Sequence, residues 1–277
     1  MHGSTRDRFA ALARAPSEAI RLDEAALLIA AEQYPDLDLA ETRHRLDALA
    51  HRVRERCPSG SERARVTALA QVLSQEAGFR GNTEDYYDPR NSFLNDVVQR
   101  RLGIPITLGI VYMEVARRVD LPLVGVSFPA HFLVRYPGPE EPVILDAFNG
   151  GAEIEPSILL AKLGGAERAG AARLLSRLLA GATSKEILVR LLGNLKAIFV
   201  GRREYHGALA AVGRMLLLAP DAARELRDRA WLHAQLECHR AALDDYARYL
   251  TLVPDDPDAT AIRAAMIELR RQVDRLN

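Results

Sequence analysis

The residues best suited to do chemistry in this chain are a histidine and an aspartate, His131 and Asp146, in two consecutive apolar segments. A histidine oriented by a carboxylate is the general base of Cys-His-Asp and related triads. The segments FPAHFLVRY and VILDAFNGG are branched and aromatic, so we expect two neighbouring strands. Since side chains alternate between the faces of a strand, His131 and Asp146 can share one face and meet.

The chain has no thiol for such a pair to activate at the N-terminus of the helix that precedes these segments. A thiol at the N-terminus of the preceding helix would have its pKa lowered by the helix dipole. That helix start carries Pro105, Ile106 and Thr107 instead. Of the two cysteines, Cys57 precedes a proline at an expected helix end, and Cys238 lies in the C-terminal third. Neither cysteine can replace the missing thiol.

The first hundred residues are predicted to be helical, because apolar residues recur with helical spacing between capping residues, prolines and glycines. The expected helices run over residues 25–33, from Asp38 to just before Cys57, from Ser61 to about Ala77, and from Asn91 or Ser92 to Leu102.

The helix that begins at Pro105 is apolar almost all round, which is typical of a helix buried at the centre of a domain. Its polar exceptions, Thr107, Glu114 and Arg118, fall on one stripe. After residue 122 the pattern changes to strands over residues 123–128, 131–136 and 143–146, with a hairpin-like loop at 137–142. Residues 155–163 and 164–182 are expected to be helical again. This order predicts an α+β domain with a small antiparallel sheet.

The last third of the chain is a repeat. LLLAPD and LTLVPD end in Pro220-Asp221 and Pro254-Asp255, 34 residues apart, and Ala208 and Ala242 keep the same offset. A period of 34 with small residues inside and proline at the end matches the tetratricopeptide pattern. An amphipathic helix over residues 259–276 would cap an all-α domain.

Composition narrows the classes of function. Lysine plus arginine and aspartate plus glutamate number 37 each, so no global field favours nucleic acid or an anionic membrane. Two cysteines exclude a disulfide-rich scaffold and a cysteine-based zinc site, and no histidine spacing predicts another metal or cofactor site. No apolar run is long enough for a signal peptide or a membrane span. We therefore expect a cytoplasmic protein.

In combination the motifs resemble a transglutaminase-like (papain-like) core. They resemble most specifically the SirB-type bacterial family, regulatory proteins in which such a domain precedes tetratricopeptide repeats. The resemblance rests on NSFL (91–94), GIP (103–105), the RR that ends the central helix, FPAHF (128–132) and LDAFNGG (145–151). It implies a transglutaminase-like domain over 1–178, with a helical part (1–102) and a core (103–163), and a repeat domain over 183–277. His131 and Asp146 match the family's triad histidine and aspartate.

Three interpretations of the pair remain open. His131 and Asp146 can be a structural hydrogen-bonded pair, can line a pocket that binds a ligand without turnover, or can serve catalysis with another nucleophile, of which Thr107 is the nearest. Asn91, Pro105 and Asn149 are candidates to line the same cleft.

Since the cysteine is absent, we expect a non-catalytic interaction or regulatory protein whose repeats bind a protein or peptide partner. Arg190, Asn194 and Lys196 are expected to contribute to that partner surface. The alternative is a papain-like hydrolase or acyltransferase with a non-cysteine nucleophile.

Overall fold

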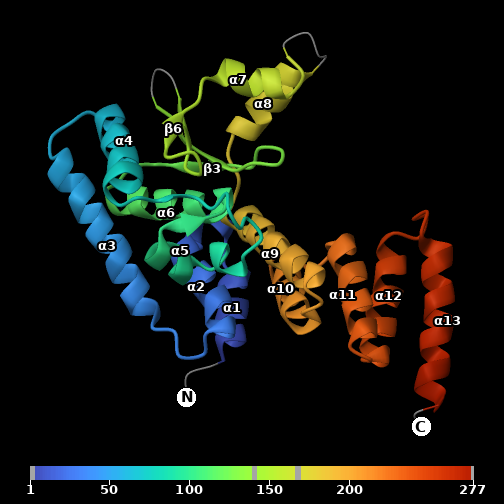
Figure 1. Ribbon diagram of the computed structural model, residues 1–277. Coiled ribbons are helices and arrows are strands. Elements are labelled where there is room, and N and C mark those ends of the chain that lie inside the picture. The colour runs from blue at the N-terminus through green and yellow to red at the C-terminus, as the bar shows by residue number, and fades with distance from the viewer. Residues whose placement is uncertain (1–3, 139–141, 166–169, 276–277) are drawn as a thin grey trace. The chain divides into compact units, whose positions relative to one another are not determined.

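The chain forms two compact units, Met1–Leu191 and Leu192–Asn277 (Figure 1). The computed structural model describes residues 4–138, 142–165 and 170–275. In these residues the first unit combines helices with small sheets and the second contains helices alone. The predicted class, an α+β domain followed by an all-α domain, is confirmed. The sequence boundary at residues 178–183 falls just before α9 (Ser184–Gly201), a helix that runs through the division between the units.

The helices of the first unit are α1 (Thr5–Arg14), α2 (Leu22–Gln33), α3 (Leu39–Arg56), α4 (Glu62–Gln71), α5 (Leu94–Arg100), α6 (Pro105–Arg118), α7 (Pro156–Lys162) and α8 (Ala171–Leu179). Its strands are β1 (Arg80–Gly81), β2 (Leu102–Gly103), β3 (Val124–Val126), β4 (Leu133–Tyr136), β5 (Val143–Asp146) and β6 (Ala152–Glu153). Turns of 3-10 helix lie at Ser17–Ala19 and Pro89–Asn91, and a π-helical turn at Val72–Glu76 extends α4.

Helix α6 is the buried centre of the first unit. Pro105 occupies its first position, where the missing N–H costs nothing, as predicted. The helix is apolar on nearly every side, and residues from Pro105 to Ala116 are buried with the exception of Met113. A helix buried all round can hold other elements in fixed positions, and α2, α3, α4, α5 and the sheet all pack against it.

The main sheet is antiparallel, in the order β3-β4-β5-β6, and lies between α6 and the α7–α8 pair in Figure 1. One face meets α6, where a Cβ atom added at Gly109 would come within 2.6 Å of the Phe132 ring. The other face carries Leu133 and Ile144 into a cluster with α7 and α8. Val134 pairs with Leu145, which sets the β4–β5 register and brings the start of β4 beside the end of β5.

Strand β5 has the predicted bounds, but β3 and β4 are shorter than the sequence predicts, and His131 lies outside the strands. Strand β4 begins at Leu133, and His131 closes a turn in which its N–H donates to the Phe128 carbonyl at 3.0 Å. Ala130 in this turn has φ +56°, a left-handed conformation that interrupts an extended ladder. Residue alternation alone gave no sign of this turn.

The expected helix from Asn91 or Ser92 to Leu102 is also wrong at both ends. Helix α5 begins at Leu94, and Asn91 lies in the preceding 3-10 turn. The helix stops because Arg101 adopts φ +63°. Gly103 therefore does not end a helix but belongs to β2, which pairs in parallel with β1.

Two of the expected helix caps are confirmed. The Asp38 side chain accepts from the Ala40 N–H at 2.8 Å, and that of Ser61 accepts from the Ala64 N–H at 3.3 Å. Parts of the expected hairpin loop (139–141), of the connector (166–169) and of the last helix (276) lie outside the described residues.

The second unit is a row of antiparallel helices in which each packs against the next. They are α10 (Tyr205–Leu218), α11 (Ala223–Gln235), α12 (His239–Leu252) and α13 (Ala259–Arg275). Ala208 and Ala242, which share the 34-residue offset, are both fully buried. A small residue at these positions lets neighbouring helices approach closely, as a tetratricopeptide repeat requires. Among the described residues, no helix is long and apolar enough to cross a membrane.

The close approach of α6 to Phe132 gives a test of how the sheet is positioned. Gly109→Ala should destabilise the protein by about 1–2 kcal/mol, because overpacking against a buried ring outweighs the better helix propensity of alanine. Gly213→Ala in α10, where an added Cβ meets nothing within 4 Å, is the matched control and should stabilise by up to about 1 kcal/mol. Urea unfolding followed by circular dichroism measures both. Equal stability of the two variants would contradict the close approach.

Candidate functional site

His131 and Asp146 are in direct contact. The His131 Nε2 lies 2.8 Å from the Asp146 Oδ2, and the two side chains are 22% and 5% exposed. Asp146 ends β5, and His131 precedes the neighbouring strand β4. The pair therefore sits at one end of the sheet, with a buried carboxylate behind a partly exposed imidazole.

The Asp146 carboxylate is held at both oxygens. Its Oδ1 accepts from the backbone N–H groups of Phe148 at 3.1 Å and Asn149 at 3.2 Å, and its Oδ2 also accepts from the Asn149 side chain at 2.7 Å. Burial raises the pKa of Asp146, but hydrogen bonds from His131 and Asn149 outweigh it and leave this pKa below its ordinary value. An ionised carboxylate at neutral pH can fix the imidazole and leaves His131 Nδ1 as the ring nitrogen for another partner.

Thr107 lies at the start of α6, where its side chain is hydrogen-bonded to backbone groups at the helix N-terminus and does not face solvent. Its side chain is fully buried. The hydroxyl is 2.6 Å from the Asn91 carbonyl and 3.1 Å from the Ile104 carbonyl, and it accepts from the Ile104 N–H at 3.2 Å. A hydroxyl has one proton to donate, so these backbone groups already occupy it. Pro105, one turn before Gly109, is buried beside it.

Asn91 orders the loop that precedes α5. It is fully buried, and its amide nitrogen donates to the carbonyls of Asp85 at 2.7 Å and Tyr86 at 3.2 Å. Its side-chain oxygen accepts from Asn82 at 3.1 Å. Because these bonds use its polar atoms within the protein, Asn91 shapes the site by placing the loop and not by offering free donors.

Two aromatic residues that the sequence did not single out connect these groups. The Phe148 ring lies 6.2 Å from the His131 ring and 6.1 Å from the Tyr86 ring, in edge-to-face contacts. Tyr86 and Tyr87 are 39% and 71% exposed. The structure thus brings His131, Asp146 and Asn149 into one cluster and Asn91, Pro105 and Thr107 into another, with Tyr86 and Phe148 between them. Large exposed aromatics beside a partly open histidine are typical of a binding surface.

Arg190, on α9, holds the turn that presents His131. Its guanidinium donates to the Phe128 carbonyl at 3.2 Å and the His131 carbonyl at 2.7 Å, and it lies 5.8 Å from the centre of the Phe132 ring. Burial lowers the pKa of Arg190. The sequence assigned this residue to a partner surface, whereas it is engaged inside the first unit. The only sequence signal was a single arginine within the apolar run ILVRLL.

The site therefore holds a base and its orienting carboxylate without a nucleophile next to them on α6. Cys57 follows α3 and Cys238 precedes α12, so neither belongs to the start of α6. No group of three or more His, Cys, Asp or Glu side chains in the described ranges is arranged to hold a metal ion. The arrangement can accept or donate a hydrogen bond at His131 and can pack a ligand against Tyr86 and Phe148.

The lowered pKa of Asp146 predicts a pH dependence of stability. Since the folded-state pKa lies below the unfolded value of about 3.9, the stabilisation is complete above that value and is lost as the pH falls through the folded pKa. Asp146→Asn should lower the free energy of unfolding by about 1.5–3 kcal/mol at pH 7, and it should reduce the loss of stability at acidic pH. Urea unfolding between pH 2 and 7 measures both effects. The same loss of stability at acidic pH in the variant as in the wild type would contradict a lowered pKa of Asp146.

Comparisons with known proteins agree with the two units. A family model described as the transglutaminase-like superfamily matches residues 40–193, and a tetratricopeptide-repeat model matches residues 195–266. A UPF0162 protein of Xylella fastidiosa is 38% identical over 270 residues, which cover 94% of each chain. A UPF0162 protein of Pseudomonas aeruginosa is 38% identical over 241 residues, 85% of this chain and 86% of the relative. The protein SirB1 of Salmonella typhimurium is 30% identical over 249 residues, 90% of this chain and 87% of the relative.

These matches cover both units and nearly the whole chain. The chain therefore belongs to the family of SirB1 and UPF0162 proteins, in which a transglutaminase-like domain is followed by tetratricopeptide repeats.

Proposed function

We propose that this chain is a non-catalytic, cytoplasmic regulatory protein that binds a protein partner through its repeats. The observation that carries the proposal is the state of Thr107, the hydroxyl nearest to where a nucleophile belongs. It is fully buried and hydrogen-bonded to backbone carbonyls. A hydroxyl in this state is not available to attack a substrate unless the start of α6 opens.

The repeat unit offers an aromatic anchor for a partner. Trp231 on α11 is 38% exposed and meets the Tyr205 ring edge-on at 5.6 Å. Tryptophan and tyrosine are the residues most often found at interaction hot spots, because they contribute large apolar area at low entropic cost. Lys196, expected to contribute, is bound to Asp228 at 2.6 Å, so its charge is matched inside the unit. Trp231 is the better candidate.

The transglutaminase-like domain has a second role in this proposal. The exposed Tyr86 and Tyr87, which Phe148 links to His131, form a surface that can hold a peptide or small ligand without turnover. Asp146 keeps the imidazole in one orientation, which lowers the entropic cost of binding at His131.

The role of the repeats is tested by comparing bait proteins in the same lysate. Trp231→Ala should reduce recovery of the partners captured by the wild-type chain by about tenfold or more, as expected for loss of a hot spot. Leu252→Ala on α12 is a control of similar exposure, 41%, and should capture as the wild type does. Equal capture by the Trp231 variant would contradict the proposal.

One observation favours the alternative of a papain-like hydrolase or acyltransferase. The His131–Asp146 pair retains hydrogen-bonding geometry at 2.8 Å, with His131 partly exposed. Under our proposal, amide, ester and thioester substrates should not be turned over above a heat-treated control. Turnover that His131→Ala abolishes, with circular dichroism unchanged, would establish the alternative instead.

A further inference from the structure

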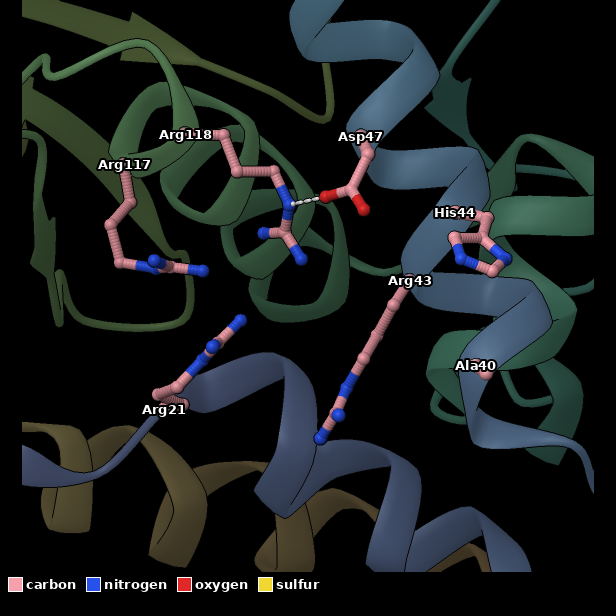
Figure 2. Close-up of a pocket in the computed structure, with 7 residues that line it drawn as sticks. All are labelled: Arg21, Ala40, Arg43, His44, Asp47, Arg117 and Arg118. Carbon is pink, nitrogen blue, oxygen red and sulfur yellow. Dashed lines mark hydrogen bonds and ion pairs between the residues drawn. The ribbon is translucent and has the colours of Figure 1, made fainter.

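A pocket of about 480 Å³ lies on the first unit, apart from the His131 cluster, and is lined mainly by arginines. Its walls come from the residue that precedes α2, from α3 and from the end of α6 (Figure 2). The lining residues are Arg21, Ala40, Arg43, His44, Asp47, Arg117 and Arg118. The lining holds four guanidinium groups and one carboxylate, and three further carboxylates, those of Asp23, Glu24 and Glu114, pair with these arginines. The surface of the pocket is therefore rich in hydrogen-bond donors.

The floor of the pocket is a buried ion network that holds Arg118. Arg118 is paired with Asp23 at 2.5 Å, Asp47 at 2.6 Å and Glu114 at 2.7 Å. Asp23 and Glu114 are themselves buried, with side chains 0% and 4% exposed. This network includes Glu114 and Arg118 from the polar stripe of α6. Its buried members Asp23, Glu114 and Arg118 are each held by more than one partner, whereas Asp47 joins it from the exposed side.

The rim of the pocket keeps donors that the protein does not use. Arg21 donates through one nitrogen to Asp23, and Arg117 donates through Nε and Nη2 to Glu114. Within the described part of the chain, Arg43 pairs with Glu24 at 3.6 Å, and its buried Nε has no hydrogen-bond partner there. A buried donor left without an acceptor costs free energy, so an acceptor at this place is favoured.

Two of the rim arginines point toward one another. Figure 2 shows Arg21, just before α2, and Arg117, on α6, extending toward the same space, with Arg118 beside them, while Arg43 runs from α3 toward α2. The carboxylates of Asp23 and Glu114 lie buried beneath and fix the guanidinium groups from behind. Like charges that point into one space repel, and an anion between them removes the repulsion.

The geometry favours a phosphate over a carboxylate. Arg21 and Arg117 point into the space, Arg43 lines the pocket from α3, and each presents a planar fork of donors. A carboxylate offers two oxygens in one plane, whereas a terminal phosphate offers three oxygens that point in three directions. The volume is within the range of sites for small organic ligands and exceeds the need of a single inorganic phosphate.

We propose that this pocket binds a small phosphorylated molecule, with its phosphate oxygens held by Arg21, Arg43 and Arg117. Arg118 and its carboxylates form the fixed floor, and the exposed His44 borders the open side. The proposal does not depend on the function of the repeats or of the His131 pair.

Calorimetric titration of the full-length protein with pyrophosphate, in phosphate-free buffer at low salt, tests the site. We expect saturable binding at one site per chain, weakened at least about tenfold by Arg43→Gln and by Arg117→Gln, since each removes a charged donor. Arg43→Gln leaves the buried network intact. Arg45→Gln is the matched control. Arg45 lies on the same helix as Arg43, pairs with Glu41 and is outside the pocket. The Arg45 variant should therefore bind pyrophosphate with the affinity of the wild type.

Three results would overturn the proposal. They are the absence of saturable pyrophosphate binding, binding that neither pocket variant weakens, and binding that the Arg45 control weakens as much as Arg43→Gln does. Citrate titrated under the same conditions distinguishes the ligand class, because citrate bound as tightly as pyrophosphate would contradict a phosphate site. Circular dichroism and the melting temperature show that each variant is folded.

Discussion

The hydrogen bond between the Thr107 hydroxyl and the Asn91 carbonyl is the contact on which the arrangement of the site depends. It joins the start of the buried helix α6 to the loop before α5 over 2.6 Å, and both residues are fully buried. The same carbonyl also accepts from the Ile104 N–H at 3.4 Å, so two hydrogen bonds hold the loop and the helix start together. Asn91 in turn binds the Tyr86 carbonyl, and the Tyr86 ring leads through Phe148 to His131.

This constraint changes what the His131–Asp146 pair can do. A nucleophile at a helix start must be exposed to substrate. Here the hydroxyl at the start of α6, that of Thr107, is buried and hydrogen-bonded to the protein's own backbone. The pair and its carboxylate remain ordered because Asn149, two backbone N–H groups and Arg190 support them. A base without a thiol at the start of α6 is the feature on which we base the proposal that this transglutaminase-like framework binds rather than cleaves.

Much of the fold could be predicted because its signals are local. The change from helical to alternating spacing after residue 122 and the proline at the start of α6 each depend on a few neighbouring residues. The 34-residue offset is visible because the same short motif occurs twice in the chain. The contact between His131 and Asp146 followed from strand order. The turn that removes His131 from β4 could not be predicted, because alanine at residue 130 rarely adopts positive φ.

The remaining features depend on contacts between distant segments. Asn91 looked like a helix cap, but its partners lie in a loop that only the folded chain brings round it. Arg190 supports the His131 turn from a helix 59 residues away. The polar stripe of α6 became a buried ion network because Asp23 and Asp47 meet it from α2 and α3. Such pairings are set by tertiary packing, and a single sequence does not show them.

The central claim, that the start of α6 offers no nucleophile, is tested most directly by intact-mass spectrometry after treatment with a fluorophosphonate, which labels activated hydroxyl groups. The account predicts an unchanged mass for the native protein. A stoichiometric adduct that maps to Thr107 and disappears in His131→Ala would contradict it, because the buried threonine would then be an activated nucleophile.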